Sequence, residues 1–221
     1  MSRPADWTPL AAADPVPGDP AEVARVGRQF QQVADQIGAD VSWLRSLCTA
    51  RFWDSGAGLA FHQRVDAAAA ELAQTHDRYL AAALALGGGL SGPGYASALA
   101  AAQSLSLRAL AQAQRAWPVM RAQLAAIHGS APSASTAAVT FLTAQPRLDS
   151  SGDPVPAVAP AGAGPRVRAA VSLYNASARE YRTANHWLAE AIALRDEAAA
   201  RAAALIQAAV GADGVKEHAQ T

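Results

Sequence analysis

Residues 19–49 read DPAEVARVGRQFQQVADQIGADVSWLRSLCT, a stretch with a clear helix start. Asp19 is a good N-cap, Pro20 suits the first helical position, and Glu22 stands where a capping box needs it. Apolar residues then recur at spacings of three and four, at Val23, Val26, Phe30, Val33, Ile37, Val41, Leu44 and Cys48. This period predicts one helix over residues 20–49, about 45 Å long at ~1.5 Å per residue.

The helical period breaks at residues 51–56 (RFWDSG) and then resumes. Asp54 or Ser55 can cap the second helix. Its apolar positions are Phe61, Val65, Ala69, Leu72, His76, Tyr79, Ala83 and Leu86. The glycines at 87–89 should end it, because glycine is costly inside a helix. Two helices of similar length joined by a short turn predict an antiparallel hairpin over residues 20–89.

A third helix is predicted over residues 91–129, opening at SGPG and ending at Gly129. Pro118 lies inside it and removes one hydrogen bond, which predicts a kink near Gln114. Its apolar positions are Leu99, Ala102, Leu105, Ala109, Ala113, Ala116, Met120, Leu124 and Ile127. A fourth helix is predicted over residues 165–211, with Gly211 and Gly214 ending it and residues 212–221 forming a tail. Its seam positions are Val167, Val171, Tyr174, Ala178, Tyr181, Asn185, Leu188, Ile192, Arg195, Ala199, Ala202, Ile206 and Ala209.

Residues 130–164 are rich in Pro, Ala, Ser and Gly, which is typical of a loop. The run at 137–142 (AAVTFL) predicts at most an ordered piece of loop, because one isolated strand is not stable. The predicted fold class is all-α, with two long antiparallel hairpins forming an elongated four-helix bundle. The long loop leaves open whether the later helices fold back on the first hairpin or leave an apolar groove for a partner.

Residues 1–19 form a proline-rich N-terminal arm. Trp7 and Leu10 could pin this arm onto the helices, or the arm could be a flexible terminus. The sequence leaves both alternatives open.

Composition argues against several classes of function. Lys+Arg is 18 and Asp+Glu is 18, so the net charge is zero and the electrostatic footprint of a nucleic-acid binder is missing. Cys48 is the only cysteine, so an intramolecular disulfide and a thiolate metal cage are both excluded. The sequence shows neither an apolar signal-peptide core nor an unbroken apolar run of membrane-spanning length.

Residues that could carry catalysis do not form a recognisable pattern. The five histidines include no pair three or four residues apart, so a helical metal-binding face is not expected. His76 and Asp77 are neighbours, and neighbours on a helix point about 100° apart, so we expect them not to converge.

Cys48 lies on an apolar face, where an inert buried thiol is expected. The sequon at Asn175 is mid-helical and is expected to be fortuitous. We expect no enzyme activity, cofactor or metal.

Tryptophans need a separate interpretation. Trp43, Trp117 and Trp187 lie near helical seams, so core packing is expected, although tryptophan also anchors interfaces. Trp53 stands in the turn, where no seam requires it. It can cap the end of the hairpin or project towards a partner.

Residues 53–61 (WDSGAGLAF) resemble the hairpin turn of the WXG/ESX proteins that type VII secretion systems export. The stretch departs from strict Trp-x-Gly by one residue and is similar to a WxxxAxxAF-like variant of larger actinobacterial members, with Trp53, Gly56 and Phe61 as motif residues. The N-terminal arm resembles the opening of the N-terminal domains of actinobacterial polymorphic toxins. Its motif residues are Trp7, Pro9, Asp14, Pro15, Pro17, Gly18, Asp19 and Pro20. The likeness covers residues 1–86, and the fourth helix fits more loosely.

The resemblance implies a non-catalytic targeting and adaptor domain at the front of a longer secreted toxin. Such a protein is cytoplasmic before export and is then secreted without a cleavable signal peptide. Its partner would be a small helical WXG-like or adaptor protein, with the secretion ATPase engaged indirectly. A free-standing secreted helical protein, structural or membrane-active, is the alternative, and an unrelated helical protein such as an enzyme subunit is the third.

The family's export signal, Tyr-x-x-x-Asp/Glu, has no counterpart in this chain. The residues four positions after the four tyrosines are Ala83, Leu99, Ala178 and Asn185. We therefore predict that the partner supplies the export signal, or that this chain uses a signal that matches the Tyr-x-x-x-Asp/Glu pattern less strictly.

Overall fold

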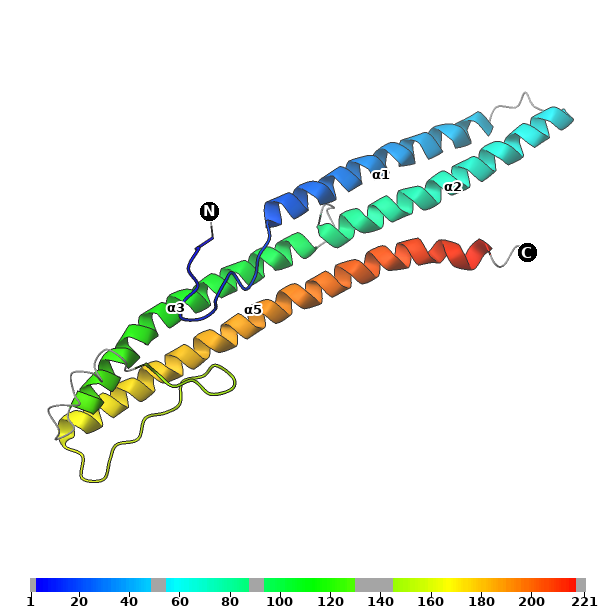
Figure 1. The fold of residues 1–221 in the computed structure, drawn as a ribbon. Coiled ribbons are helices and arrows are strands. Elements are labelled where there is room, and N and C mark those ends of the chain that lie inside the picture. Colours follow the sequence, from blue (N-terminus) through cyan, green and yellow to red (C-terminus); the bar gives the residue numbers. More distant parts are fainter. Residues whose placement is uncertain (1–2, 49–54, 88–93, 130–144, 218–221) are drawn as a thin grey trace. The chain divides into compact units, whose positions relative to one another are not determined.

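The computed structural model describes residues 3–48, 55–87, 94–129 and 145–217, and these residues are all-α (Figure 1). The helices are α1 (Pro20–Cys48), α2 (Gly56–Leu86), α3 (Tyr95–Gly129) and α5 (Pro165–Glu217). The predicted all-α class is thereby confirmed, whereas the elongated four-helix bundle stays a prediction. Among the described residues, none of the helices combines the length and the apolar character that a membrane span requires.

Contacts within the chain divide it into two compact units, and each is described by itself. The first unit holds Met1–Pro17 and Ala101–Ala193, and the second holds Gly18–Ala100 and Leu194–Thr221. The arm and most of α3 therefore belong to the first unit. The second unit contains the α1–α2 hairpin.

In the second unit, α1 and α2 lie side by side as an antiparallel hairpin (Figure 1). Asp19 caps α1, because its Oδ1 accepts hydrogen bonds from the N–H groups of Ala21 and Glu22 at 2.9 and 3.3 Å. The Glu22 carboxylate pairs with Arg25, one turn further along the helix, and does not show the predicted capping-box arrangement. Ser55 caps α2 by accepting from the N–H of Gly58 at 3.2 Å.

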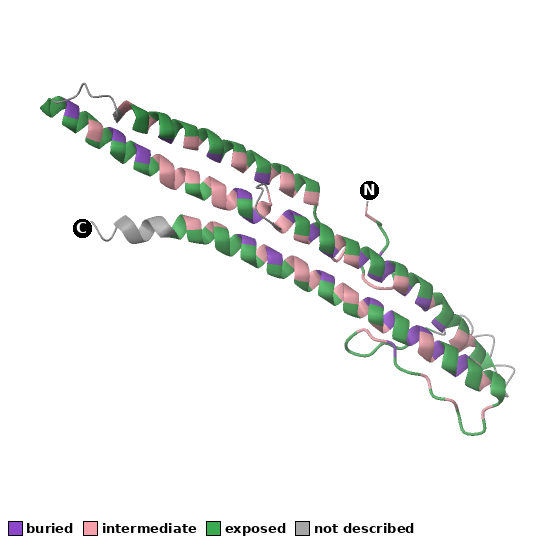
Figure 2. Cartoon of the chain, turned by 180° about the vertical axis from the view of Figure 1, so that it is seen from behind, coloured by how far each residue is buried: buried purple, intermediate pink, exposed green. Residues whose placement is uncertain are grey.

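The hairpin packs through a narrow stripe of mostly small residues. In α1 the buried positions Gly27, Ala34 and Val41 are seven residues apart, the spacing of a coiled-coil seam. Figure 2 shows such buried positions recurring along the helices. Because the stripe is narrow, bulky residues flank it. Val33 and Phe61 were predicted to lie in the core and are 40% and 38% exposed, so that prediction was wrong for both.

The first unit packs α3 against α5 through alanines and tyrosines. The core cluster consists of Ala113, Ala116, Met120, Tyr174, Ala178, Tyr181 and Ala184. These residues all lie on the faces that the sequence period predicted, apart from Ala184. The α3 helix continues through Pro118, and both Pro118 and Gln114 are exposed, so the carbonyl that loses its helical partner lies on an exposed side. The bend predicted there stays a prediction.

The fourth predicted helix ends later than expected. Helix α5 runs to Glu217, so Gly211 and Gly214 do not terminate it. By contrast, Gly87 ends α2 with φ 89°, in the left-handed conformation that a helix C-terminus favours. A glycine inside a helix costs about 1 kcal/mol, and it ends the helix only where the chain turns.

Candidate functional site

The N-terminal arm is folded against the helices of the first unit. The Trp7 side chain is 1% exposed and Val16 is fully buried. The Trp7 indole N–H donates to the Pro4 carbonyl at 3.0 Å. The Trp7 carbonyl accepts from the N–H groups of Leu10 and Ala11 at 2.9 and 3.0 Å, which closes a tight turn. The flexible-terminus alternative is therefore wrong for residues 3–17.

Arg3 and Asp14 join the two ends of the arm. Nε and Nη2 of Arg3 donate to the two carboxylate oxygens of Asp14 at 2.5 and 2.6 Å, the two-pronged geometry in which arginine binds carboxylates best. The guanidinium also lies 4.8 Å from the centre of the Trp7 ring, within cation–π range. These hydrogen bonds from Arg3, with that from the Val16 N–H, hold the pKa of Asp14 below its ordinary value despite partial burial.

Both ends of the arm are also fixed to α3. Arg3 donates to Ser106 Oγ at 3.1 Å and to the Gln103 carbonyl at 3.4 Å. The Gln103 side-chain amide donates in turn to the Val16 carbonyl at 3.2 Å. Ser106 is fully buried, and its hydroxyl is satisfied by accepting from Arg3 and donating to the Gln103 carbonyl at 2.8 Å.

The middle of the arm is fixed to α5. Tyr181 donates its hydroxyl hydrogen bond to the Pro9 carbonyl at 2.8 Å. Leu10 packs against the α3–α5 core cluster. Burial raises the pKa of the Tyr181 hydroxyl, with the nearby Asp153 charge adding to it, so this group stays a neutral donor.

The predicted N-terminal motif divides between two roles. Trp7, Pro9 and Asp14 belong to the docked arm, whereas Asp19 and Pro20 begin α1. Pro15 is partly buried and Pro17 is exposed. Gly18 has φ +124°, which L-residues rarely adopt, and a Cβ at this position would lie 3.2 Å from Leu99 Cδ2. The motif therefore encodes arm docking and helix initiation.

Arg3 was not identified from the sequence. It anchors the arm through partners eleven and about a hundred residues away. An irregular segment has no period that could reveal such a pair. The available signal was an arginine close in sequence to the arm's one aromatic residue, Trp7, and to its acidic residues.

Only part of the predicted hairpin-turn motif can be located. Trp53 lies outside the described residues. Gly56 opens α2, and a Cβ there would meet nothing within 4 Å, so the local structure does not require glycine. Phe61 is part-exposed, with its ring 6.5 Å from that of His62. The described residues therefore do not gather this motif into one site.

The tryptophans on helices differ in burial. Trp43 was expected in the core and is 62% exposed, so that prediction was wrong. It comes nine residues after the buried Ala34, and at 100° per residue this places it on the opposite side of α1. Trp117 and Trp187 are partly buried, Trp117 with its ring 5.4 Å from that of Tyr181 and Trp187 beneath the guanidinium of Arg108 at 5.1 Å.

The described part of the predicted loop is docked on α5, because side chains of α5 form hydrogen bonds with main-chain atoms of the loop. Tyr174 donates to the Val155 carbonyl at 3.1 Å. The Asn175 side chain both donates to and accepts from the backbone of Ala157, each at 2.9 Å. Asn185 donates to the Gly152 carbonyl at 2.8 Å. The sequon asparagine therefore has a structural role, and the run predicted at 137–142 lies outside the described residues.

The second unit brings three residues of catalytic type to one hollow. Ser42, His76 and Asp77 line a space of about 280 Å³ between α1 and α2. His76 and Asp77 were expected not to converge, and this was wrong, because their side chains approach to 2.9 Å. Ser42 donates to the Gly38 carbonyl one turn back along α1, however, and the Asp77 side chain is 77% exposed. The arrangement lacks the nucleophile–base hydrogen bond of a catalytic triad.

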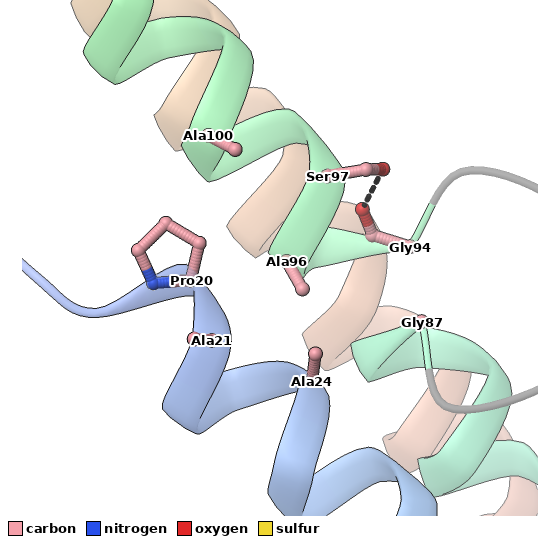
Figure 3. Close-up of a pocket in the computed structure, with 8 residues that line it drawn as sticks. All are labelled: Pro20, Ala21, Ala24, Gly87, Gly94, Ala96, Ser97 and Ala100. Atoms are coloured by element: carbon pink, nitrogen blue, oxygen red, sulfur yellow. Dashed lines mark hydrogen bonds between the residues drawn. The ribbon is translucent and has the colours of Figure 1, made fainter. Parts of the chain in front are cut away.

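A second hollow lies where α1 begins, α2 ends and α3 begins (Figure 3). It measures about 470 Å³ and is lined by Pro20, Ala21, Ala24, Gly87, Gly94, Ala96, Ser97 and Ala100. Its one polar side chain, Ser97, donates to the Gly94 carbonyl at 2.8 Å, so no polar groups converge on a ligand there. Within the described residues, no group of three or more His, Cys, Asp and Glu side chains could hold a metal ion.

Comparison of the chain with protein-family models, with curated proteins and with solved structures gives no match.

Proposed function

We propose that this chain is a non-catalytic targeting and adaptor domain of a protein secreted by a type VII system, and that it binds a small helical partner. The resemblance of residues 1–86 to such domains motivates the proposal. The α1–α2 hairpin is the element that a helical partner would pack against, on the face of α1 opposite the seam that joins α1 to α2.

Exposure of Trp43 is the observation that carries this proposal. A tryptophan with 62% of its surface in water forgoes most of its hydrophobic stabilisation. Tryptophan is also the residue type most often found as an energetic anchor of interfaces. In α1 it lies opposite the seam that packs on α2, so a partner can reach it without opening the hairpin.

The positions after the tyrosines support a signal supplied by the partner. Three of the residues four positions on, Ala83, Leu99 and Ala178, are at most 1% exposed. The fourth, Asn185, is bound to the docked loop. An acidic residue at the three buried positions would carry a charge into the core, so the fold itself disfavours the family's signal there.

The test is affinity purification of the tagged chain from its native host, with intact-mass analysis of the proteins that co-elute. We expect a stoichiometric helical partner of roughly 100 residues, a common domain size. Trp43→Ala should weaken its recovery roughly 30-fold, the effect of losing an interface anchor of about 2 kcal/mol.

Leu173→Ala is the matched control, because Leu173 is a comparably exposed residue (53%) on α5 in the first unit. It should leave recovery of the partner unchanged. A monomer without any partner, or a partner retained equally by both variants, would contradict the proposal.

A further inference from the structure

We propose that residues 3–17 form a releasable strap, latched by the Arg3–Asp14 ion pair, whose opening uncovers the α3–α5 core while the helices stay folded. The inference rests on the geometry of the first unit and does not depend on the proposed function. It assigns a conformational role to the arm.

The strap closes a core that two thin helices cannot close alone. Four of the seven residues in the α3–α5 cluster are alanines, whose short side chains shield little of their neighbours. Leu10 from the arm and Ala157 from the docked loop pack against this cluster from outside the helices. Extended segments thus take the place that further helices occupy in a bundle.

Few side chains of the strap are buried, which makes it easier to detach than a helix. Only Trp7 and Val16 are buried among residues 3–17. Beside the strap lies a hollow of about 260 Å³, with Pro9, Leu10 and Tyr181 among its lining residues. Segments with few buried contacts open locally at lower free energy than the elements beneath them.

Arg3 supplies several of the contacts that hold the strap. Its guanidinium contacts Asp14 near the far end of the strap, the Trp7 ring in the middle, and both Ser106 and the Gln103 carbonyl on α3. The side chains of Arg3 and Asp14 retain 16% and 25% exposure, so water reaches the latch. Removing this one side chain severs every contact named here.

The strap ends at a residue suited to a change of chain direction. Gly18 has φ +124°, and it is the first residue of the second unit. Glycine adopts this conformation without steric cost. Rotation there would let residues 3–17 lift while α1 keeps its Asp19 cap.

The test is native-state hydrogen exchange of the full chain, resolved at single amides. The reporters are the N–H groups of Leu10 and Ala11, bound to the Trp7 carbonyl, and of Val16, bound to Asp14. We expect Arg3→Ala to speed their exchange at least ~10-fold, the loss of a charge-assisted contact worth about 1.4 kcal/mol. Core amides of α3, α5 and the hairpin should keep their rates.

Two variants sharpen the result. Arg25→Ala removes a comparable arginine–carboxylate pair, with Glu22 on α1, and should leave the reporters unchanged. Arg3→Lys keeps the charge and loses the planar two-pronged geometry, so its reporters should exchange at intermediate rates.

Either of two outcomes would overturn the proposal. One is reporter exchange in Arg3→Ala at the wild-type rate. The other is acceleration of the α3 and α5 amides together with the strap. Should Arg3→Ala fail to fold, the wild-type chain in low denaturant decides: the reporters must open at lower free energy than the α3 and α5 amides, and equal values refute the strap.

Discussion

At the scale of single residues, Trp7 and Trp43 have opposite environments, with 1% and 62% of their surfaces exposed. Truncating an enclosed tryptophan typically costs about 3–5 kcal/mol. We expect Trp7→Ala to destabilise the chain by at most about 3 kcal/mol, since a strap that lifts independently limits the loss. Trp43→Ala should change stability by less than about 0.5 kcal/mol. Urea denaturation followed by circular dichroism measures both, and equal losses would contradict the assignment.

Asp14 predicts how the strap responds to acid. Its pKa is lowered in the folded protein, chiefly by the hydrogen bonds from Arg3, from an ordinary value of 3.8. The charged Asp14 carboxylate therefore stabilises the docked strap fully at pH values above its ordinary pKa. This stabilisation is lost as the pH falls through the lowered pKa of the folded protein. Exchange of the Leu10 and Ala11 amides, corrected for intrinsic rates, should therefore accelerate below about pH 4.

Asp14→Asn should remove this acid dependence by weakening the latch at every pH. Glu22→Gln is the control, because the pKa of Glu22 is also lowered by an arginine, Arg25, but on α1. It should leave the acid dependence of the strap intact. An unchanged pH profile in Asp14→Asn would refute the role of this carboxylate.

At the scale of elements, the α2–α3 connection depends on a glycine. A Cβ built at Gly94 would lie 2.2 Å from the Gly87 nitrogen and 2.3 Å from its Cα, where both neighbours are backbone and cannot give way. We expect Gly94→Ala to cost at least about 1–3 kcal/mol, the range of overpacking. At Gly56 a Cβ meets nothing within 4 Å, so Gly56→Ala should be neutral or stabilising by up to about 1 kcal/mol. Thermal melting compares the two, and similar shifts would contradict the close approach.

The docked loop supplies a second prediction at this scale. Asn175→Ala removes both side-chain bonds to the Ala157 backbone and should cost about 1–3 kcal/mol, because it leaves a part-buried N–H and carbonyl without those partners. Thr183→Ala is the control, because its hydroxyl bonds only to the Arg179 carbonyl on the exposed side of α5. Limited proteolysis within residues 145–157 should quicken in the first variant alone. Equal protection in both would show that Asn175 does not hold the loop.

Regular elements were predictable where their signals are local. The Asp19 cap and the glycine after α2 gave two helix ends, and the three-and-four spacing placed Tyr174 and Tyr181 in the core. The end of α5 was missed because a glycine interrupts a helix only when tertiary contacts require a turn. The loop docking was missed because its partners are main-chain atoms, which carry no sequence pattern. The available signal of loop docking was the presence of Tyr174 and Asn175 on a helix that follows a proline-rich loop.

At the scale of the whole molecule, sequence period was sufficient for the all-α class but not for the division into units. That division puts the arm with most of α3 and the first part of α5, although α1 follows the arm directly in the chain. The deciding contacts join residues about a hundred or more positions apart, such as Arg3 with Ser106 and Pro9 with Tyr181. Each depends on a tertiary arrangement that local propensity does not encode. For the same reason Trp43 was placed in a core that the narrow hairpin seam does not provide.

We expect export to depend on the partner as well as on this chain. The residues four positions after the four tyrosines are either buried in the core or, for Asn185, bonded to the docked loop. The folded chain therefore presents no Tyr-x-x-x-Asp/Glu signal of its own. We therefore expect secretion to require the partner identified by co-purification. In a host strain lacking that partner, the tagged chain should remain with the cells, and restoring the partner should return it to the medium. Immunoblots of the two fractions, with an unrelated substrate of the same system as the control, measure this. Export of the chain without any partner would contradict the dependence and move the search for a signal to the chain itself.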